Sequence, residues 1–203
     1  MILQRKPYVF GYPEKGEYEM SVGTKVKLHL GCGKRHFPGF IHIDRDPWEH
    51  LDYQRDIKDL SNFEDNSVDL IYLCHCFNSF DDDDARAALK EWHRILKKGG
   101  ILRIAVPDFE AISKAYLKFK DLKLVKRLVT GYYKGKLGTD YHRSVYDEAT
   151  LKKLLEECGF KNVHRWDWRK TFHAEYDDYS QAYLPHMDKE NGMLVSLNLE
   201  AEK

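Results

Sequence analysis

Short apolar runs that look like strands alternate with segments at helical spacing along most of this chain, and this alternation limits its fold more than any other feature. Val68 to Cys76 is nearly all apolar, as expected of a strand covered on both faces. Segment 81–97 carries apolar residues at helical spacing, and we expect the Gly99-Gly100 pair to end that helix. Strands that alternate with helices favour a largely parallel sheet. The predicted strands are 25–30, 40–43, a weaker one before Asp56, 68–76, 101–106, 161–168 and 193–201, and the predicted helices are 81–97, one or two within 109–129, and 147–158.

The length of 203 residues suits one domain. Residues 1–24, which carry several prolines and glycines, read as an irregular lead-in to a domain at 25–203, within which 109–146 is predicted to form a helical cap. The 33 lysines and arginines balance 33 aspartates and glutamates, which argues against nucleic acid as a partner. The positive charge of the basic stretch 114–136 would attract a phosphorylated acceptor or RNA, although the favoured interpretation of this stretch is a solvated helix face. Without a run apolar enough for a signal peptide or a membrane span, the expected location is the cytoplasm.

The residues directly after the predicted strands carry the chemistry, because ligands of an open parallel sheet bind beyond the carboxyl ends of its strands. Glycines after the first strand allow a sharp turn and a close approach of a ligand. A carboxylate after the second strand is suited to accept hydrogen bonds from ribose hydroxyls. One acidic residue at a strand end has little meaning, whereas an ordered set is informative. In strand order the set is Gly31-Cys32-Gly33, Asp44, Asp56 with Ile57, Cys74-His75-Cys76, and Pro107-Asp108.

With these residues the chain resembles the S-adenosylmethionine-dependent methyltransferases of the seven-stranded, Rossmann-like class. The similarity runs from Leu28-His29-Leu30-Gly31-Cys32-Gly33 through Asn66-Ser67-Val68-Asp69-Leu70-Ile71-Tyr72 and Glu91 to Ile104, and Pro107-Asp108, Cys158-Gly159-Phe160 and 196–201 extend it toward a bacterial subgroup often associated with surface-polysaccharide genes. The resemblance implies an α/β fold: a doubly wound, mostly parallel seven-stranded sheet with helices on both faces. It also implies S-adenosylmethionine as the cofactor.

The resemblance assigns cofactor contacts residue by residue. Gly31, Cys32 and Gly33 would lie against the methionine part, and Cys74 and His75 would line the same end. Asp44 would hold the ribose, while Asp56 and the Ile57 backbone would face the adenine.

The chain departs from the family pattern in three places. Arg35 stands where the third glycine of the glycine-rich loop is usual. Only residues 31–39 separate the first two strands, so the first helix is expected to be one turn or absent. Phe77-Asn78-Ser79 replaces the Leu-Glu-His triplet that many relatives carry.

Metal sites are not favoured by the sequence. Asp81 to Asp84 suits a solvated helix start, where the helix dipole favours negative charge, better than a metal site. Cys74 and Cys76, expected on one face of a strand, suit a buried apolar pair better than metal ligands, because no second ligand pair accompanies them.

Transfer to a hydroxyl requires a base, and Asp108, His75 and His142 are the candidates. The acceptor is expected to be a sugar or another small polar molecule, bound by the aromatic-rich segments 130–146 and 169–190; simple packing of these aromatics is the alternative. His173 and the carboxylates of the second segment belong to this expectation. An RNA or protein methyltransferase and a non-catalytic cofactor-binding protein stay open as alternatives. A nicotinamide-dependent dehydrogenase is disfavoured, because its acidic residue usually lies about 20 residues beyond the glycines.

Overall fold

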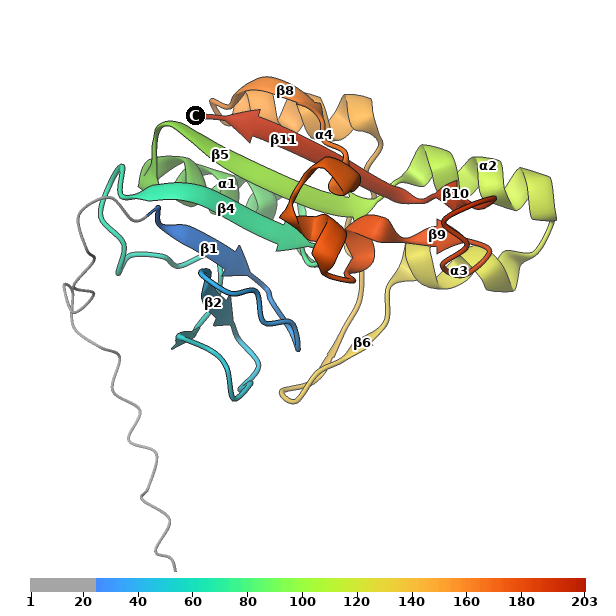
Figure 1. Ribbon diagram of the computed structural model, residues 1–203, viewed down its shortest axis with the longest axis horizontal. Helices are drawn as coiled ribbons and strands as arrows, with labels where there is room; N and C mark the ends of the chain where they lie inside the picture. The colour runs from blue at the N-terminus through green and yellow to red at the C-terminus, as the bar shows by residue number, and fades with distance from the viewer. Residues whose placement is uncertain (1–24) are drawn as a thin grey trace, which may run out of the picture.

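A seven-stranded sheet forms the centre of the computed structural model, which describes residues 25–203; the expected lead-in at 1–24 lies outside the described residues. Across the sheet the strands run β3-β2-β1-β4-β5-β11-β8 (Figure 1). Their bounds are β1 Lys27–Leu30, β2 Ile41–Asp44, β3 Tyr53–Gln54, β4 Val68–Cys74, β5 Leu96–Pro107, β8 Lys161–Arg165 and β11 Ser196–Glu202.

The sheet is mostly parallel. Strands β1 to β5 pair in parallel, and β11 is antiparallel to both of its neighbours, β5 and β8. The predicted fold class, a Rossmann-like sheet of seven strands, is confirmed. The carboxyl ends of β1, β2 and β4 therefore meet at one edge, where the predicted ligand residues come directly after them.

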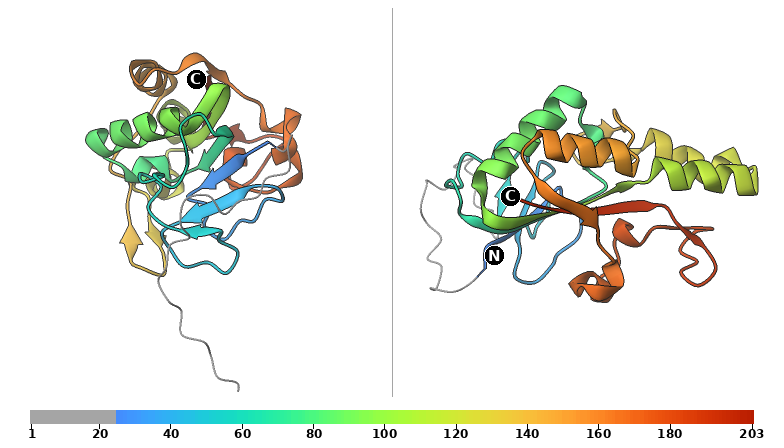
Figure 2. Two further views of the ribbon diagram at one scale, coloured as in Figure 1. Left: turned by 90° about the vertical axis from the view of Figure 1, so that its left-hand side faces the viewer. Right: turned by 90° about the horizontal axis from the view of Figure 1, so that it is seen from above.

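Two long helices, α1 (Asp82–Ile95) and α4 (Glu148–Glu157), cover one face of the sheet (Figure 2, right). Asp81 caps α1 by accepting a hydrogen bond from the Asp84 backbone N–H, so the aspartate run begins the helix as the dipole favours. The apolar stripe of α1 is buried in the main core, where the ring of Trp92 is fully enclosed. This core packs α1 against the strands of the sheet.

The opposite face is covered by short elements instead of long helices. Loop 31–40 and the 3₁₀ helices η2 (Trp168–Lys170) and η3 (Phe172–Glu175) pack there against Tyr72 and Trp166. A fourth 3₁₀ helix, η4 (Tyr179–Gln181), comes next in the same segment, and η1 spans Phe77–Ser79 after β4. The helical layers on the two faces are thus unequal.

The connection from β1 to β2 contains turns and no helix over residues 31–40, all of which are described, so the expected shortening of the first helix is confirmed. The expected end of the helix over 81–97 is wrong. The helix ends at Ile95, because Leu96 takes an extended conformation, is buried, and pairs with Val68 at the start of β5. The glycine pair lies inside the irregular beginning of β5.

Beyond the end of β5 lies the region 109–146 that was expected to form a helical cap. It contains α2 (Phe109–Phe119), α3 (Leu122–Thr130) and a small hairpin of β6 (Tyr133–Lys134) and β7 (Thr139–Asp140). A separate apolar cluster packs α2 and α3 against β9 (Tyr183–Leu184) and β10 (Met193–Leu194). The hairpin lies beneath the ends of β1 and β2 in Figure 1.

Candidate functional site

A cavity opens at the carboxyl ends of β1, β2 and β4. The loops after these strands form one side of it, and the hairpin of β6 and β7 and the segment around η4 form the other. The residues that line it are His29, Gly31, Cys32, Gly33, Arg35, Asp44, Arg45, Asp56, Ile57, Lys58, Cys74, His75, Cys76, Ser79, Phe80, Asp84, Tyr133, Asp140, Arg143 and Tyr179. The predicted cofactor residues, which follow β1, β2, β4 and the short strand β3, are therefore brought together.

The two glycines after β1 take left-handed backbone conformations, with φ of +59° at Gly31 and +57° at Gly33. A Cβ at Gly31 would lie 2.7 Å from the Cys76 Sγ, whereas a Cβ at Gly33 would meet no atom within 4 Å. Gly31 is thus required by the packing beneath the loop. Gly33 leaves open space on the cavity side, where a ligand can approach the backbone.

Asp44 ends β2 and braces the glycine loop. Its Oδ2 accepts a hydrogen bond of 2.8 Å from the Gly33 N–H, and its Oδ1 accepts one of 2.8 Å from the Asp46 N–H. Burial raises the pKa of the Asp44 carboxyl, and the two backbone N–H groups oppose that shift. Each carboxylate oxygen retains a further lone pair, which suits the two hydroxyls of a ribose.

Asp56 and Ile57 form the next part of the wall. The Asp56 carboxylate accepts the Lys58 N–H, and the Ile57 side chain lies within the main core. The Ile57 carbonyl accepts a hydrogen bond of 2.8 Å from the Trp92 indole N–H, which ties this wall to α1. An apolar side chain beside a carboxylate suits a flat heterocycle that carries an amino group.

Cys74 and Cys76 do not share a face, so that expectation is wrong. Cys74 packs toward the cluster of Tyr72 and Trp166, and Cys76 packs into the main core on the other side. The strand ends at Cys74, and His75 has a φ of +53°, which breaks the alternation of side chains. Burial raises the pKa of both thiols, to about 12 at Cys76, which keeps them protonated at neutral pH.

His75 reaches the cavity from the end of β4. Its Nε2 lies 3.0 Å from the Ser196 Oγ, and its ring packs against Tyr179 with centroids 5.5 Å apart. Burial lowers the pKa of His75 to about 3, so the imidazole is neutral at physiological pH. Cys32, the middle residue of the glycine loop, contacts the His50 ring at 3.7 Å, and burial raises the pKa of its thiol.

Asp108 and His142, the other two candidate bases, are not among the residues that line the cavity. Asp108 is 4% exposed; it caps α2 by accepting the Ala111 N–H and pairs with the Arg165 guanidinium at 3.2 Å. The His142 ring packs so closely on Gly131 that a Cβ there would lie 2.3 Å from it. Burial lowers the pKa of His142. Both side chains thus have structural contacts that account for their positions.

The two aromatic-rich segments contribute only part of their residues to the cavity. Tyr133, Asp140 and Arg143 line it from 130–146, and Tyr179 lines it from 169–190. The predicted His173 is instead fully buried on the β-sheet. Of the basic stretch 114–136, only Tyr133 reaches the cavity.

His173 belongs to a buried polar cluster. Asp178 accepts hydrogen bonds from the Tyr72 and Ser180 hydroxyls and lies 3.5 Å from the His173 Nδ1. Burial opposes ionisation of Asp178, but its contacts with His173, Ser180 and Tyr72, in that order of effect, lower its pKa to about 2. The cluster fixes the segment that presents Tyr179 to the cavity.

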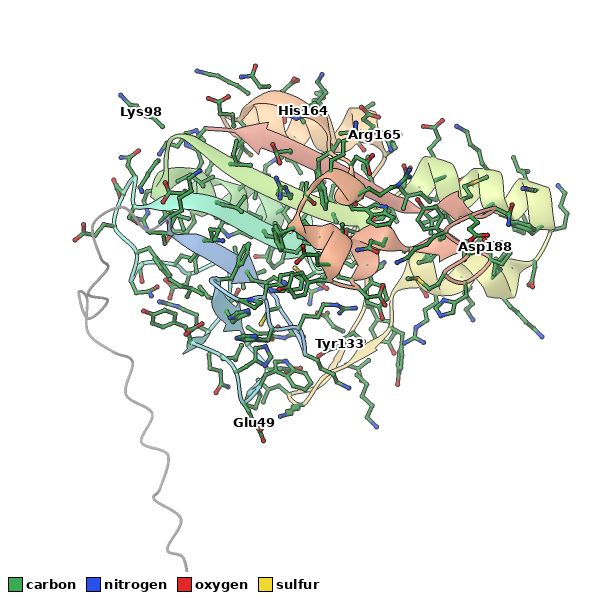
Figure 3. All side chains as sticks on the ribbon, viewed as in Figure 1. Glu49, Lys98, Tyr133, His164, Arg165 and Asp188 are labelled. Carbon is green, nitrogen blue, oxygen red and sulfur yellow. The ribbon has the colours of Figure 1, made fainter. Side chains whose placement is uncertain are left out.

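Asp46 was missed by the sequence reasoning. It is 1% exposed, and its carboxylate accepts the backbone N–H groups of Lys136 at 3.0 Å and Leu137 at 3.1 Å. Tyr133, on the inner side of the hairpin, adds a hydroxyl contact at 3.4 Å (Figure 3). These bonds close the hairpin over the cavity. Their only sequence signal is an acidic residue two positions after Asp44, which is too common to be informative.

Metal-binding clusters and membrane-spanning helices are both absent from residues 25–203. In this range, three or more His, Cys, Asp or Glu side chains do not gather into a group that could hold a metal ion. No helix of the same range is both long and apolar enough to cross a membrane.

Comparisons with known proteins agree with this geometry. A family described as a methyltransferase domain matches residues 38–104. The fold matches a crystal structure of a SAM-dependent methyltransferase from Archaeoglobus fulgidus with a TM-score of 0.55, 14% identity, and coverage of 89% of this chain and 87% of that one. The chain carries a methyltransferase domain with a Rossmann-like fold.

Other relatives of this methyltransferase domain differ in what their names say they act on. A ubiquinone/menaquinone biosynthesis C-methyltransferase from Pseudoalteromonas translucida is 32% identical over 156 residues, which are 74% of this chain and 59% of the relative. Another from Klebsiella pneumoniae is 34% identical over 112 residues, 50% of this chain and 42% of the relative. The chain therefore spans roughly half the length of these curated relatives. A Burkholderia thailandensis 1,6-didemethyltoxoflavin-N1-methyltransferase, solved with that compound and S-adenosylhomocysteine, matches with a TM-score of 0.51 and 14% identity over 88% of this chain and 70% of that one.

Proposed function

We propose that this protein transfers the methyl group of S-adenosylmethionine to an oxygen of a sugar or another small polar acceptor. The observation that carries the proposal is the cavity in which Gly33, Asp44 and Ile57 meet His75 and Tyr179. The first three residues suit the cofactor, and the last two lie where an acceptor would meet it.

The residues of the cavity fit the cofactor. The open space at Gly33 suits the methionine part, and the spare lone pairs of Asp44 suit the ribose hydroxyls. Asp56 and Ile57 suit the adenine, with Ile57 held in place by Trp92. When bound, S-adenosylmethionine supplies an activated methyl group on a sulfonium. The main task of the protein is then to hold the acceptor in line with it, and such positioning contributes several kcal/mol to rate enhancement.

His75 is the best placed of the three candidate bases, because it alone lines the cavity. With a pKa lowered to about 3 it is a weak base, so we assign it to accepting a hydrogen bond from the acceptor hydroxyl and orienting it. Asp108 and His142 do not line the cavity, and we assign neither of them a contact with the acceptor. A full proton transfer would then be completed by water at the open side of the cavity.

The charged rim favours a polar acceptor. Four cationic and four acidic side chains line the cavity, namely Arg35, Arg45, Lys58, Arg143, Asp44, Asp56, Asp84 and Asp140. The resemblance to a subgroup associated with surface-polysaccharide genes agrees with a sugar. The names of the curated relatives favour a second candidate, methylation at carbon of a quinone-like ring. An RNA substrate is disfavoured because the basic stretch 114–136 hardly reaches the cavity.

Calorimetric titration with S-adenosylmethionine and S-adenosylhomocysteine tests the cofactor part of the proposal. We expect binding in the micromolar range for the wild type and its loss in Asp44→Ala. Asp65→Ala is the matched control, since Asp65 is an exposed partner of Arg94 outside the cavity. A folded wild-type protein that binds neither compound would refute the proposal.

Release of S-adenosylhomocysteine, measured with matched panels of sugars, nucleotide-sugars and quinone-like phenols, tests the acceptor. Turnover of sugars alone supports O-methylation of a sugar. Turnover of phenols alone, with the methyl group found on a ring carbon of the product, supports the second candidate. Cofactor binding without turnover of any acceptor would favour a non-catalytic binding protein.

A further inference from the structure

The cationic side chains of the cavity differ in whether they have a partner. Arg45 pairs with Asp140 at 3.1 Å, and Lys58 pairs with Asp84 at 2.9 Å. Arg35 has no carboxylate within 4.0 Å among residues 25–203. A half-buried guanidinium without a counter-charge is costly unless something else supplies one.

Arg35 is nevertheless held firmly. Its guanidinium carbon lies 4.8 Å from the centre of the Tyr179 ring, and its Nε donates a hydrogen bond of 3.1 Å to the Asp177 carbonyl. Its two terminal nitrogens, Nη1 and Nη2, donate to no group in the described part of the chain. The planar guanidinium is thus fixed by the tyrosine ring and by its Nε, while Nη1 and Nη2, which we call the fork, are free to donate. Such a fork can bind an oxyanion through two parallel hydrogen bonds.

The surroundings of Arg35 place this fork on the acceptor side of the cavity. Tyr179, on which it stacks, also packs against His75. Asp177 and Tyr179 belong to the segment 169–190, which the sequence predicts to contribute to acceptor binding. Asp178 offers no competing partner, because its carboxylate already accepts hydrogen bonds from two hydroxyls within the buried cluster.

Arg143 is a second cationic side chain of the cavity that lacks a close carboxylate partner. Arg143 also lines the cavity, and its nearest carboxylate in the described chain, that of Asp81, is 3.9 Å away with both side chains more than half exposed. Such a contact contributes little to stability. Two weakly engaged guanidinium groups therefore line the cavity.

We infer that Arg35 is the specificity-determining residue for an acceptor that carries an oxyanion, either a carboxylate or a phosphate, and that its fork holds this group while the acceptor hydroxyl faces His75. The inference rests on the proposed methyl transfer, and it narrows the acceptor from a polar molecule to an anionic one. A purely structural Arg35 would need only its ring contact and its Nε, and would leave the fork without a function.

The test is calorimetric titration of the whole chain, both free and saturated with S-adenosylhomocysteine. The probes are inorganic phosphate, glucuronate, glucose 1-phosphate and, as the neutral match, glucose. The variants are Arg35→Gln, Arg35→Lys and Arg127→Gln. Arg127 is the matched control, because its guanidinium also lies over a tyrosine ring, that of Tyr132, and also donates to a backbone carbonyl, yet lies outside the cavity.

We expect the wild type to bind phosphate and at least one anionic sugar, and to prefer it to glucose by about tenfold or more, the effect of one charge-assisted hydrogen bond or two. Arg35→Gln should abolish this preference and leave affinity for S-adenosylhomocysteine within about threefold, since the neutral side chain keeps neither the charge nor the fork. Arg35→Lys should retain part of the preference, and Arg127→Gln all of it.

Three results would overturn the inference. One is a wild type without preference for anions. Another is a preference that persists in Arg35→Gln, which would indicate an adventitious ion only. The third is a loss of affinity for S-adenosylhomocysteine in Arg35→Gln, which would mean that the fork binds the carboxylate of the cofactor itself. If the wild type fails to bind S-adenosylhomocysteine, the proposed function fails, and the titration of the free protein still decides whether Arg35 binds anions.

Discussion

Asp46 is the fastening point of the hairpin over the cavity, and replacing it by asparagine should release the hairpin. Its Oδ2 accepts the Lys136 N–H and its Oδ1 accepts the Leu137 N–H, so both oxygens are in use. Asparagine keeps one oxygen and turns an NH₂ group toward the other N–H donor. Loss of one charge-assisted hydrogen bond in a buried site costs about 1.5–3 kcal/mol. In a domain of this size each kcal/mol lowers the Tm by about 2–4 °C, which predicts a fall of about 3–12 °C.

Differential scanning calorimetry measures the fall in Tm, and limited trypsin digestion reports on the hairpin, which contains Lys134 and Lys136. We expect cleavage there to become faster in Asp46→Asn. Asp188→Asn is the matched control, and Asp188 lies away from Tyr133 of the hairpin (Figure 3). Asp188 also accepts two backbone N–H groups, but both bonds end on its Oδ1, so asparagine can keep them. An Asp46→Asn variant that melts within about 1 °C of the wild type and is cut no faster than the control would refute this role of Asp46.

Three further predictions concern the walls of the site. Gly33→Ala should lower the free energy of unfolding only by the left-handed strain of about 1–2 kcal/mol, and yet weaken S-adenosylhomocysteine binding more than tenfold in calorimetry. Gly31→Ala should unfold at a much lower denaturant concentration, because its Cβ meets the Cys76 side chain. Equal cofactor affinity for Gly33→Ala and wild type would contradict this prediction. Tyr72→Phe should lower the free energy of unfolding by about 1.5–3 kcal/mol, since the buried Asp178 carboxylate loses a donor, and an unchanged urea midpoint would argue against that bond. The free energy of unfolding should fall as the pH falls from about 6.5 toward 3, because the unfolded chain binds a proton at His75 in that window and the folded chain does not. In His75→Asn, the slope of the urea-measured free energy of unfolding against pH should be smaller by up to about one proton. An identical slope in wild type and variant would contradict the lowered pKa of His75.

The parts of the fold that sequence reasoning predicted are those governed by local rules. The end of β1 is marked by Gly31 and the end of β2 by Asp44, because a tight turn needs a particular residue type and a buried strand needs a particular pattern. That the helix between β1 and β2 is at most one turn was predictable from the short connection between these strands, and the structure has none there. The end of α1 was misplaced because glycine usually ends helices. Here the helix ends before the glycine pair, because Leu96 pairs with Val68 in the sheet.

The parts that were not predicted depend on contacts between residues far apart in the chain. Asp46 contacts Lys136, 90 residues away, and Arg35 contacts Asp177, 142 residues away. No local pattern distinguishes a clasping aspartate from a surface one. His173 was expected near the acceptor for its chemistry, but its neighbours on the sheet bury it completely.

The two halves of the cavity differ in the same way: local contacts build one half, and contacts between residues far apart in the chain build the other. The cofactor half is built by short loops after β1, β2 and the strand β3, whose geometry is set by the sheet itself. The other half is built by Tyr133 and Tyr179, which are carried by a hairpin and a 3₁₀ helix that the sheet does not specify. Each of these two elements is fastened by one buried carboxylate, Asp46 or Asp178. Arg35 links the two halves, since the loop after β1 carries it to the η4 segment, where it contacts Asp177 and Tyr179. We therefore expect substitutions in the hairpin, in the η4 segment and at Arg35 to change acceptor preference more than cofactor affinity, and substitutions at Gly33 and Asp44 to do the reverse.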